Sequence, residues 1–390
     1  MSVAALPGLD QPLAVSRRAS RRIVVCAGYS PSLLNFRGPL LRELVGRGHE
    51  VIACGPRAAR ELREALGVLG VAFREVPCDR AGLSVRRDLR LLRALVMLFR
   101  SARPDIVLNY TIKPVIYGSL AARLAGVPNV YSMITGVGYA FGDGPGRRAV
   151  RMAASAMLRL SLPGNRAVFF QNPDDRSMFE QLGLLGRRGR AVLINGSGVD
   201  IDAYRPVPYP QRLSFLLIAR LLADKGVREY VAAARLIRAR YPDVRFSLVG
   251  PLDPNPSALR GEEIQAWVNE GLIDYLGELE DVRPAIAASS VYVLPSYREG
   301  TPRTVLEAMA MGRPAVTSDA PGCRETVVHG VNGFLVPVRD AGALAQALDR
   351  FIQQPELIDR MGRESRRIVA DKYDVHKVNR VILETMRLDP

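Results

Sequence analysis

Two carboxylates, Glu299 and Glu307, stand on either side of a predicted helix start in the second half of the chain. The apolar spacing over Thr301–Met311 predicts a helix, which puts Glu299 just before it and Glu307 about two turns into it. Such carboxylates can accept hydrogen bonds from the hydroxyl groups of a sugar and of a ribose. The ordinary alternative is that Glu299 caps the helix and Glu307 lies on its solvated face.

The start of this helix is also a predicted phosphate site. Val291–Pro295 predicts a strand that leads into it, and Pro302 is expected at the first helical position, where a missing N–H costs nothing. The amides of Arg303 and Thr304 are then free to donate, and the positive end of the helix dipole favours an anion. A phosphate beside two sugar-binding carboxylates suits a nucleotide sugar.

Two cations follow another predicted strand, Leu213–Ala219. Arg220 and Lys225 lie in the loop after its carboxyl end, where open α/β sheets bind ligands, so they can neutralise a diphosphate. The alternative is a pair of solvated loop cations. Asp200 and Asp202 form a D-x-D that could hold a metal ion, but they lie far from these cations in the sequence. We therefore expect neither a metal nor a cofactor.

These residues belong to longer segments with a recognisable pattern. Glu299–Pro337 resembles the donor-binding region of the family 4 retaining glycosyltransferases, which have the GT-B fold; it carries the family's E-x7-E pair, a Pro-Gly turn with Glu325 and the run Asn332–Leu335. Ala219–Val227 is similar to the family's G-R-L-x-x-x-K-G, with alanine in place of the first glycine. Asn195–Ile201 resembles the family's N-G-V-D turn. The resemblance covers nearly the whole chain.

The resemblance implies transfer of a sugar from a nucleotide diphosphate with retention of configuration. It implies catalytic roles for Glu299, Arg220 and Lys225. Leu279 would pack on the nucleotide base, although simple core packing is an equal alternative for it. The donor-binding residues implied by the resemblance are Glu307, Gly300, Thr301, Arg303, Thr304, Leu279 and Gly250.

The first half is expected to hold the acceptor. The loop from Gly28 to Asn35 follows the first predicted strand and has no dinucleotide-binding G-x-G-x-x-G. Lys113 is a candidate phosphate or acceptor contact, although many family members carry a histidine near this point. A glycine-rich loop supplies the remaining candidates, which are Thr135, Gly136 and Gly138.

Three segments, Asn109–Pro114, Ile134–Phe141 and Glu299–Thr304, resemble a subgroup that extends polyprenyl-diphosphate-linked sugars in bacterial surface-polysaccharide and glycan assembly. This implies that a hexose or N-acetylhexosamine moves from a UDP sugar to a lipid-linked saccharide. Two rival functions stay open. One is a GT-B nucleotide-sugar epimerase that hydrolyses its donor. The other is a basic nucleic-acid-binding protein, for which the sequence has neither a recognised module nor interleaved aromatic residues.

Strand and helix patterns alternate in both halves, which predicts an α/β fold of two Rossmann-like, doubly wound domains facing a central cleft. We expect a disordered tail over 1–20, an acceptor-side domain over 21–203, a proline-rich linker over 204–211 and a donor-binding domain over 212–373. A terminal helix is expected over 374–390, and it can either extend away or pack back on the first domain. Strands are predicted at Arg22–Gly28, His49–Cys54, Asp105–Asn109, Asn129–Met133, Ala167–Phe170, Leu213–Ala219, Arg245–Gly250, Ile273–Gly277, Val291–Pro295 and Pro314–Ser318. Helices are predicted at Phe36–Arg47, Val227–Arg240 and Thr301–Met311, and one or two helices over Ala341–Arg367.

The charge of the chain is unevenly placed. Its net charge is +15, and residues 1–190 hold 29 Lys and Arg against 13 Asp and Glu. This excess favours an anionic partner: a phosphate-bearing substrate, a membrane surface or nucleic acid. An equal alternative is an arginine-rich composition whose surface arginines are only solvated. One predicted helix carries a stripe of arginines opposite an apolar face, which suits either an anionic membrane or ordinary packing on a sheet. The arginines are Arg86, Arg90, Arg93 and Arg100, and the apolar residues are Leu89, Leu92, Leu95, Val96 and Phe99.

Other features concern the cellular location. The longest apolar run is far shorter than the ~18 residues that a membrane span needs. The N-terminal segment does not have the pattern of a signal peptide, and the four cysteines form no C-x-x-C pair. We therefore expect a cytoplasmic protein that attaches peripherally to the inner face of the cytoplasmic membrane.

Overall fold

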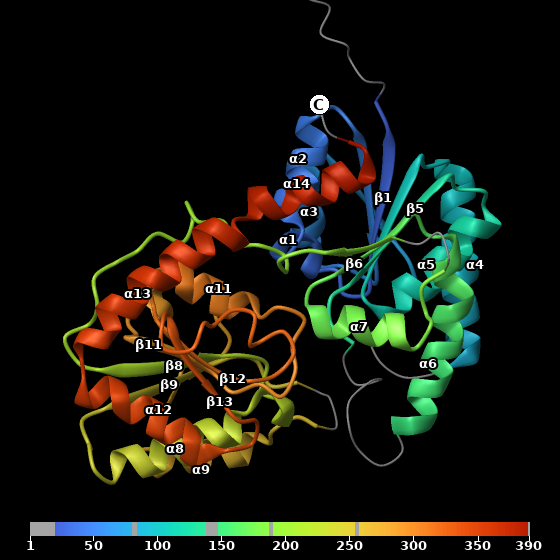
Figure 1. Ribbon diagram of the computed structural model, residues 1–390. Coiled ribbons are helices and arrows are strands. Elements are labelled where there is room, and N and C mark those ends of the chain that lie inside the picture. The colour runs from blue at the N-terminus through green and yellow to red at the C-terminus, as the bar shows by residue number, and fades with distance from the viewer. Residues whose placement is uncertain (1–19, 80–83, 138–146, 187–189, 254–256, 389–390) are drawn as a thin grey trace, which may run out of the picture.

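The computed structural model describes residues 20–79, 84–137, 147–186, 190–253 and 257–388. These residues form two α/β domains, each built on one parallel sheet with helices on its faces (Figure 1). The doubly wound, two-domain fold expected from the sequence is confirmed. Residues 1–19 and Gly138, for which the sequence predicts a disordered tail and an acceptor contact, lie outside the described residues.

The first domain has a seven-stranded sheet with the order β3-β2-β1-β4-β5-β6-β7. Buried β-branched runs form its centre, as in β1, where all residues but the first are buried. The order reverses beside β1, and such a reversal is where ligands bind in doubly wound sheets. The strands are β1 (Arg22–Ala27), β2 (Glu50–Gly55), β3 (Val71–Glu75), β4 (Ile106–Tyr110), β5 (Asn129–Ile134), β6 (Ala167–Phe170) and β7 (Arg190–Leu193).

The second domain has a six-stranded parallel sheet with the order β10-β9-β8-β11-β12-β13. Its reversal lies between β8 and β11, and the loops after these two strands carry the predicted catalytic residues. The strands are β8 (Ser214–Ile218), β9 (Arg245–Val249), β10 (Asp274–Tyr275), β11 (Val291–Leu294), β12 (Ala315–Ser318) and β13 (Gly333–Val336).

Helices cover both faces of each sheet, and α14 crosses back to the first domain (Figure 1). No helix in the described part of the chain combines the length and the apolarity that crossing a membrane would require. In the first domain the helices are α1 (Ser32–Asn35), α2 (Gly38–Gly46), α3 (Arg60–Val68), α4 (Val85–Ala102), α5 (Ile112–Leu124), α6 (Arg147–Ser161) and α7 (Pro173–Gln181). The others are α8 (Val227–Arg238), α9 (Gly261–Asn269), α10 (Arg283–Ala287), α11 (Arg303–Ala310), α12 (Ala341–Gln353), α13 (Glu356–Ile368) and α14 (Val375–Met386).

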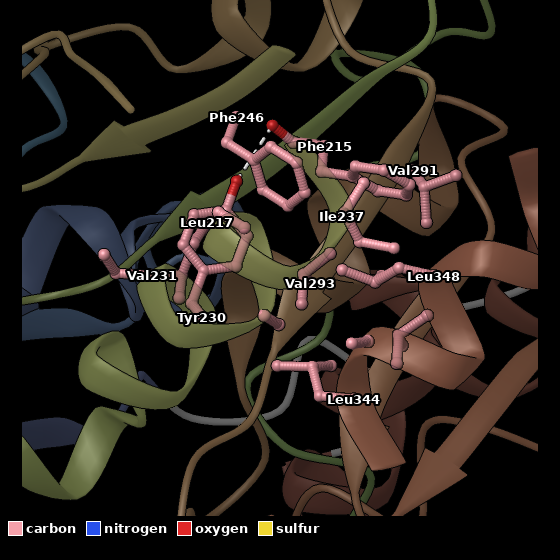
Figure 2. Packing of buried hydrophobic residues seen from close by; sticks show 14 of the residues in the cluster. Phe215, Leu217, Tyr230, Val231, Ile237, Phe246, Val291, Val293, Leu344 and Leu348 are labelled. Atoms are coloured by element: carbon pink, nitrogen blue, oxygen red, sulfur yellow. Dashed lines mark hydrogen bonds between the residues drawn. The ribbon is translucent and has the colours of Figure 1, made fainter. Parts of the chain in front are cut away.

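The main core of the second domain lies between its sheet and helices α8 and α12. Phe215 and Phe246 from the sheet meet Tyr230 of α8, and Leu344 and Leu348 of α12 close the other side (Figure 2). The Tyr230 hydroxyl is buried, but it donates a hydrogen bond to the Phe215 carbonyl at 3.0 Å, so this buried polar group is satisfied. This packing fixes the sheet edge that carries the candidate site.

The C-terminal helix α14 belongs to the core of the first domain, although it follows the second domain in sequence. Ile382 and Leu383 pack with the residues of β1 and α2. At the end of α14, the Leu388 carbonyl accepts a hydrogen bond from Arg47 at 2.9 Å. The chain therefore crosses between the domains twice, and both crossings tie one domain to the other.

Several predicted elements need correction. The predicted helix at Phe36–Arg47 begins only at Gly38, after the separate short helix α1. The segment Ala341–Arg367, predicted as one or two helices, contains two, α12 and α13. In α4, Leu89 is 58% exposed and does not lie on the buried face, which is formed by Asp88, Leu91, Leu95 and Phe99. The sequence reading missed β3 and β7, which lie at the two edges of their sheet.

Candidate active site

The loop from β11 to α11 brings the predicted carboxylate and the predicted lysine together. Lys225 ends a short 3-10 helix after β8, and its Nζ lies 2.5 Å from Glu299 Oε1. Both side chains are about 15% exposed, so the pair is shielded yet reachable. A carboxylate held in this way can accept from a sugar hydroxyl, while the ammonium group remains able to face a phosphate.

Arg220 lies on the same edge of the sheet, two residues after the end of β8 in the loop that also carries Lys225. Its guanidinium donates to Asp253 at 2.9 Å and stays 41% exposed. Gly250, at the end of β9, is required here: its φ is +148°, and a Cβ at this position would collide with the Ala219 carbonyl. The close approach of these two strand ends sets the position of the Arg220 backbone.

The N-terminus of α11 has free donors, as the sequence predicts. The first amide of the helix with a backbone acceptor is that of Val305, which donates to Pro302 at 3.2 Å. Within the described residues, the amides of Arg303 and Thr304 have no hydrogen-bond acceptor. Pro302 itself precedes the helix as its N-cap, with extended backbone, so the predicted first-position proline is off by one residue.

The Thr304 side chain anchors this turn to the sheet. Its hydroxyl oxygen lies 2.6 Å from the Tyr292 hydroxyl of β11 and 3.3 Å from the carbonyl oxygen of Ile218 in β8. The hydroxyl is therefore occupied inside the protein, and the part of Thr304 that can contact a phosphate is its backbone amide.

Glu307 lies in the interior and not on a solvated face. Its Oε1 accepts from Arg303 at 2.8 Å and from the Tyr204 hydroxyl at 3.1 Å. Burial raises the pKa of the Glu307 carboxyl, although the arginine and the tyrosine oppose the shift. Burial also raises the pKa of the Tyr204 hydroxyl, which therefore stays protonated and donates to the carboxylate.

The first domain packs directly on the Glu299 loop. A Cβ at Gly300 would collide with the Thr135 carbonyl and with the side chain of Gln171, so only glycine fits this contact. Gly136 faces the same backbone, and its hypothetical Cβ would lie 3.3 Å from the Gly300 amide nitrogen. The Thr301 hydroxyl donates to the Gln171 carbonyl at 2.9 Å. Two predicted acceptor residues, Thr135 and Gly136, thus meet the predicted donor residue Gly300.

Asn172 holds this interface together. Its side-chain oxygen caps α7 by accepting from the Asp175 amide at 2.7 Å, and its side-chain nitrogen donates to the carbonyls of Gly300 at 2.9 Å and Glu299 at 3.3 Å. Asp175 is fully buried and accepts from Arg298, the residue before Glu299. Burial raises the pKa of the Asp175 carboxyl, and the arginine counteracts part of that shift.

The other predicted residues of the first domain are more dispersed. Gly28 lies against Thr111, which has a left-handed φ of +68° before α5. The Asn35 carbonyl accepts from Arg303 of the second domain. Lys113 is held by Asp88 of α4 at 2.8 Å, in a pair that is at most 15% exposed. Lys113 therefore already has its counter-charge, and its predicted role as a phosphate contact stays a prediction.

Two further predictions concern a base contact and a metal. Leu279 is partly buried and packs against the core beneath α11, so its base-stacking role also stays a prediction. The D-x-D carboxylate of Asp200 accepts from the amides of Asp202 and Ala203 at 3.0 Å each, which is a turn. Among the described residues, no group of three or more His, Cys, Asp or Glu side chains could hold a metal ion.

Sequence reasoning missed three residues of this site: Asn172, Asp175 and Tyr204. Asn172 and Asp175 follow the predicted strand Ala167–Phe170 in an N-P-x-D pattern, which is a recognisable helix start. That signal predicts the cap of α7 but not the contact across the domain interface. Tyr204 stands at the head of the proline-rich linker, and nothing in its surroundings points to a carboxylate partner.

Comparisons with known proteins match both domains of the chain. Residues 37–196 match the model of the glycosyl transferase 4-like domain, and residues 212–354 match that of the glycosyl transferases group 1. The chain is 27% identical over 341 residues to the N,N'-diacetylbacillosaminyl-diphospho-undecaprenol alpha-1,3-N-acetylgalactosaminyltransferase of Campylobacter jejuni, covering 84% of this chain and 88% of that protein. It is 25% identical to the UDP-Gal:alpha-D-GlcNAc-diphosphoundecaprenol alpha-1,3-galactosyltransferase of Escherichia coli, covering 77% of this chain and 80% of that protein.

Solved structures share the fold. Sucrose-phosphate synthase from Thermosynechococcus elongatus matches with a TM-score of 0.79 at 17% identity, covering 94% of this chain and 98% of its own. Anabaena HepE, solved in complex with UDP and glucose, matches with a TM-score of 0.76 at 19% identity, covering 94% and 99%. At these identities the likeness concerns the GT-B architecture alone.

Proposed function

Because this chain belongs to the glycosyltransferases whose two domains are the 4-like domain and the group 1 domain, we propose that it transfers a hexose or N-acetylhexosamine from a UDP sugar to a polyprenyl-diphosphate-linked saccharide, with retention of configuration. The donor binds mainly to the second domain and the acceptor to the first. The product is an extended lipid-linked glycan of the kind used in bacterial surface-polysaccharide assembly.

The observation that carries this proposal is the pair of Glu299 and Lys225 beside the free amides of α11. The pair brings an acceptor for sugar hydroxyls to within 2.5 Å of a cation, at the edge of a sheet where a helix N-terminus can take a phosphate. A sugar bonded to a diphosphate presents these two chemistries side by side. Glu307, with its tyrosine and arginine partners, is the candidate for the ribose.

The reaction breaks the bond between the sugar C1 and the terminal phosphate oxygen and forms a bond from C1 to the acceptor oxygen on the same face. The acceptor proton goes to the departing phosphate. Negative charge grows on that phosphate in the transition state, where Lys225, Arg220 and the amides of Arg303 and Thr304 stabilise it. One preorganised donor of this kind contributes about 3 kcal/mol in comparable sites.

The nature of the acceptor is inferred from the relatives and from charge. Both relatives named above act, by their names, on diphosphoundecaprenol-linked sugars. The Escherichia coli relative is named for a UDP-galactose donor, which supports UDP as the nucleotide here. The basic excess of the first half suits an acceptor that carries a diphosphate.

We further propose that the first domain rests on an anionic membrane. The stripe residues Arg86, Arg90, Arg93 and Arg100 are all exposed on α4. Exposed apolar side chains accompany them: Leu89 is 58% and Met97 is 62% exposed. A helix with exposed arginines and exposed apolar groups can bind a lipid headgroup region, where each arginine contributes about 1 kcal/mol.

The function is tested by release of a nucleoside diphosphate from a panel of UDP, GDP, ADP and dTDP sugars, with and without a bacterial lipid extract. We expect release from one donor, chiefly a UDP sugar, and a strong increase when lipid is added. Release of nucleotide and free sugar that lipid does not stimulate would instead identify a hydrolysing epimerase. Binding of duplex DNA or RNA on filters, without any donor turnover, would point to the nucleic-acid alternative.

A further inference from the structure

The side chain of Arg37 is buried in the first domain without a partner. Arg37 is the N-cap residue of α2 and is 3% exposed. Among the described residues its guanidinium has no ion pair and no hydrogen-bond acceptor, and its Nε is fully enclosed. The guanidinium lies over the ring of Tyr110, whose centroid is 5.4 Å from the guanidinium carbon.

Another buried arginine of the same chain shows what a structural role requires. Arg313 is 0% exposed, and its three guanidinium nitrogens all donate to backbone carbonyls, among them Val207 at 2.8 Å and Ala287 at 2.9 Å. A buried charge is tolerated when its donors are satisfied in this way, whereas an unpaired one costs several kcal/mol. Arg37 stays charged at neutral pH, because burial lowers its pKa only to about 10.

The location of Arg37 identifies the kind of partner it lacks. It lies between β1 and α2, at the edge of the sheet that faces the second domain. The preceding residues touch Arg303: the Asn35 carbonyl accepts from its guanidinium, which also lies 5.6 Å over the Phe36 ring. Among the described residues, the first amide of α2 with a backbone acceptor is that of Leu41, which donates to the Arg37 carbonyl at 2.8 Å, so the helix start beside Arg37 adds positive potential. The missing partner is an anion.

We propose that Arg37, with the N-terminus of α2, binds a phosphoryl group of the acceptor's diphosphate. This inference rests on the proposed function and adds a binding residue to it. The donor phosphates have their own candidates in the second domain, Lys225 and Arg220. The Arg303 side chain donates to Glu307 and to the Asn35 carbonyl, and so separates the proposed donor-phosphate position from the proposed acceptor-phosphate position. The Tyr110 hydroxyl is hydrogen-bonded to the Ser32 hydroxyl at 2.9 Å, and the Tyr110 ring supports the Arg37 guanidinium.

The test is calorimetric binding of geranyl diphosphate, a short soluble prenyl diphosphate, to protein saturated with UDP so that the donor phosphate site is filled. The variants are Arg37→Met and, as a control with the same loss of charge, Arg63→Met on the exposed face of α3. We expect Arg37→Met to weaken geranyl diphosphate binding by about tenfold or more, since a charge-assisted hydrogen bond contributes that much. The control should bind as the wild type does.

Two further measurements make the result decisive. The Kd for UDP should be unchanged in Arg37→Met, and its melting temperature should not fall, because the substitution removes an unpaired buried charge. Wild-type affinity for geranyl diphosphate in Arg37→Met, or an equal loss of UDP affinity, overturns the proposal. If Arg37→Met does not fold, Arg37→Lys, which keeps the charge, is tested by the same two affinities. We expect its affinity for geranyl diphosphate to fall at least a few-fold. An unchanged affinity would contradict the proposal.

The proposed function fails separately from this inference. Transfer to a lipid acceptor that bears no phosphate would refute the acceptor class whatever Arg37 does. Transfer to a diphosphate-linked acceptor, together with unchanged geranyl diphosphate binding in Arg37→Met, would refute the role of Arg37 alone.

Discussion

The side-chain nitrogen of Asn172 in the first domain lies 2.9 Å from the carbonyl oxygen of Gly300 in the second. The same nitrogen donates to the Glu299 carbonyl, so one buried amide fixes two consecutive peptide groups of the loop that carries Glu299. Asn172 is therefore a positioning residue: the packing of one domain against the other sets where the Glu299 carboxylate points.

Replacement of Asn172 by alanine should lower kcat by about ten- to a hundredfold, because misplacement of a catalytic group by an ångström costs that much. The Kd for the nucleoside diphosphate should change less than twofold. Asn165→Ala is the matched control, since Asn165 is a buried asparagine of the same domain that bonds Ser132 far from the interface. Equal losses of kcat in the two variants would mean that Asn172 only stabilises the fold.

Glu299→Ala should reduce transfer by about 10²- to 10³-fold, in line with the loss of one polar group that acts in the transition state. Nucleoside diphosphate binding should survive, because the carboxylate is proposed to hold the sugar. Glu263→Gln is a suitable control, as this glutamate pairs with Arg228 on the surface of the same domain. Near wild-type transfer by Glu299→Ala would show that the site has been assigned to the wrong residues.

Glu307→Gln should change how stability depends on pH. Burial raises the pKa of the Glu307 carboxyl above its ordinary value of 4.5, so the native state keeps a proton that the unfolded chain releases. Between 4.5 and the raised native pKa, the free energy of unfolding of the wild type therefore falls as pH rises. Glutamine cannot ionise, and other groups contribute equally to both proteins. The stability of Glu307→Gln relative to wild type should thus increase across this window in urea denaturation, and a difference that is constant with pH would contradict it.

Reversal of Arg86, Arg90 and Arg93 to glutamate should strongly weaken binding to anionic vesicles, and high salt should release the wild type, because the Debye length falls from ~10 Å at 0.1 M to ~3 Å at 1 M. Activity on a short soluble acceptor should change little. A triple reversal in the second domain provides the same change of net charge; the exposed residues Arg235, Arg240 and Arg363 serve for this. If both triple variants bind vesicles equally, the stripe on α4 is only a solvated helix face.

The sequence alone was sufficient for the features that depend on local pattern. The strands that end before Arg220 and Glu299 are continuous apolar runs, and the E-x7-E pair lies on a helix start of ordinary composition, so periodicity and family resemblance predict both. Lys225 and Glu299 are 74 residues apart, and their contact follows once two adjacent parallel strands end at the same edge.

Contacts between elements that are distant in the sequence could not be predicted in the same way. The partner of Glu307 is a linker tyrosine, and the partner of Lys113 is an aspartate inside a helix that reads as amphipathic. Asn172 has the signature of a helix cap and performs that role as well. In each case the local sequence pattern has a simpler explanation, and only the three-dimensional arrangement reveals the contact that the residue makes with a distant element.

The central claim is that this enzyme moves sugar from a nucleotide onto a lipid diphosphate through the Glu299–Lys225 site. It is tested most directly by incubating the wild type and Glu299→Gln with a sugar-labelled UDP donor and undecaprenyl-diphosphate-linked N-acetylglucosamine, and extracting with butanol. We predict that label moves into the butanol phase with the wild type, in proportion to the UDP released, and does not move with Glu299→Gln. Label that stays in the aqueous phase as free sugar while UDP is released, or equal transfer by both proteins, would contradict the account.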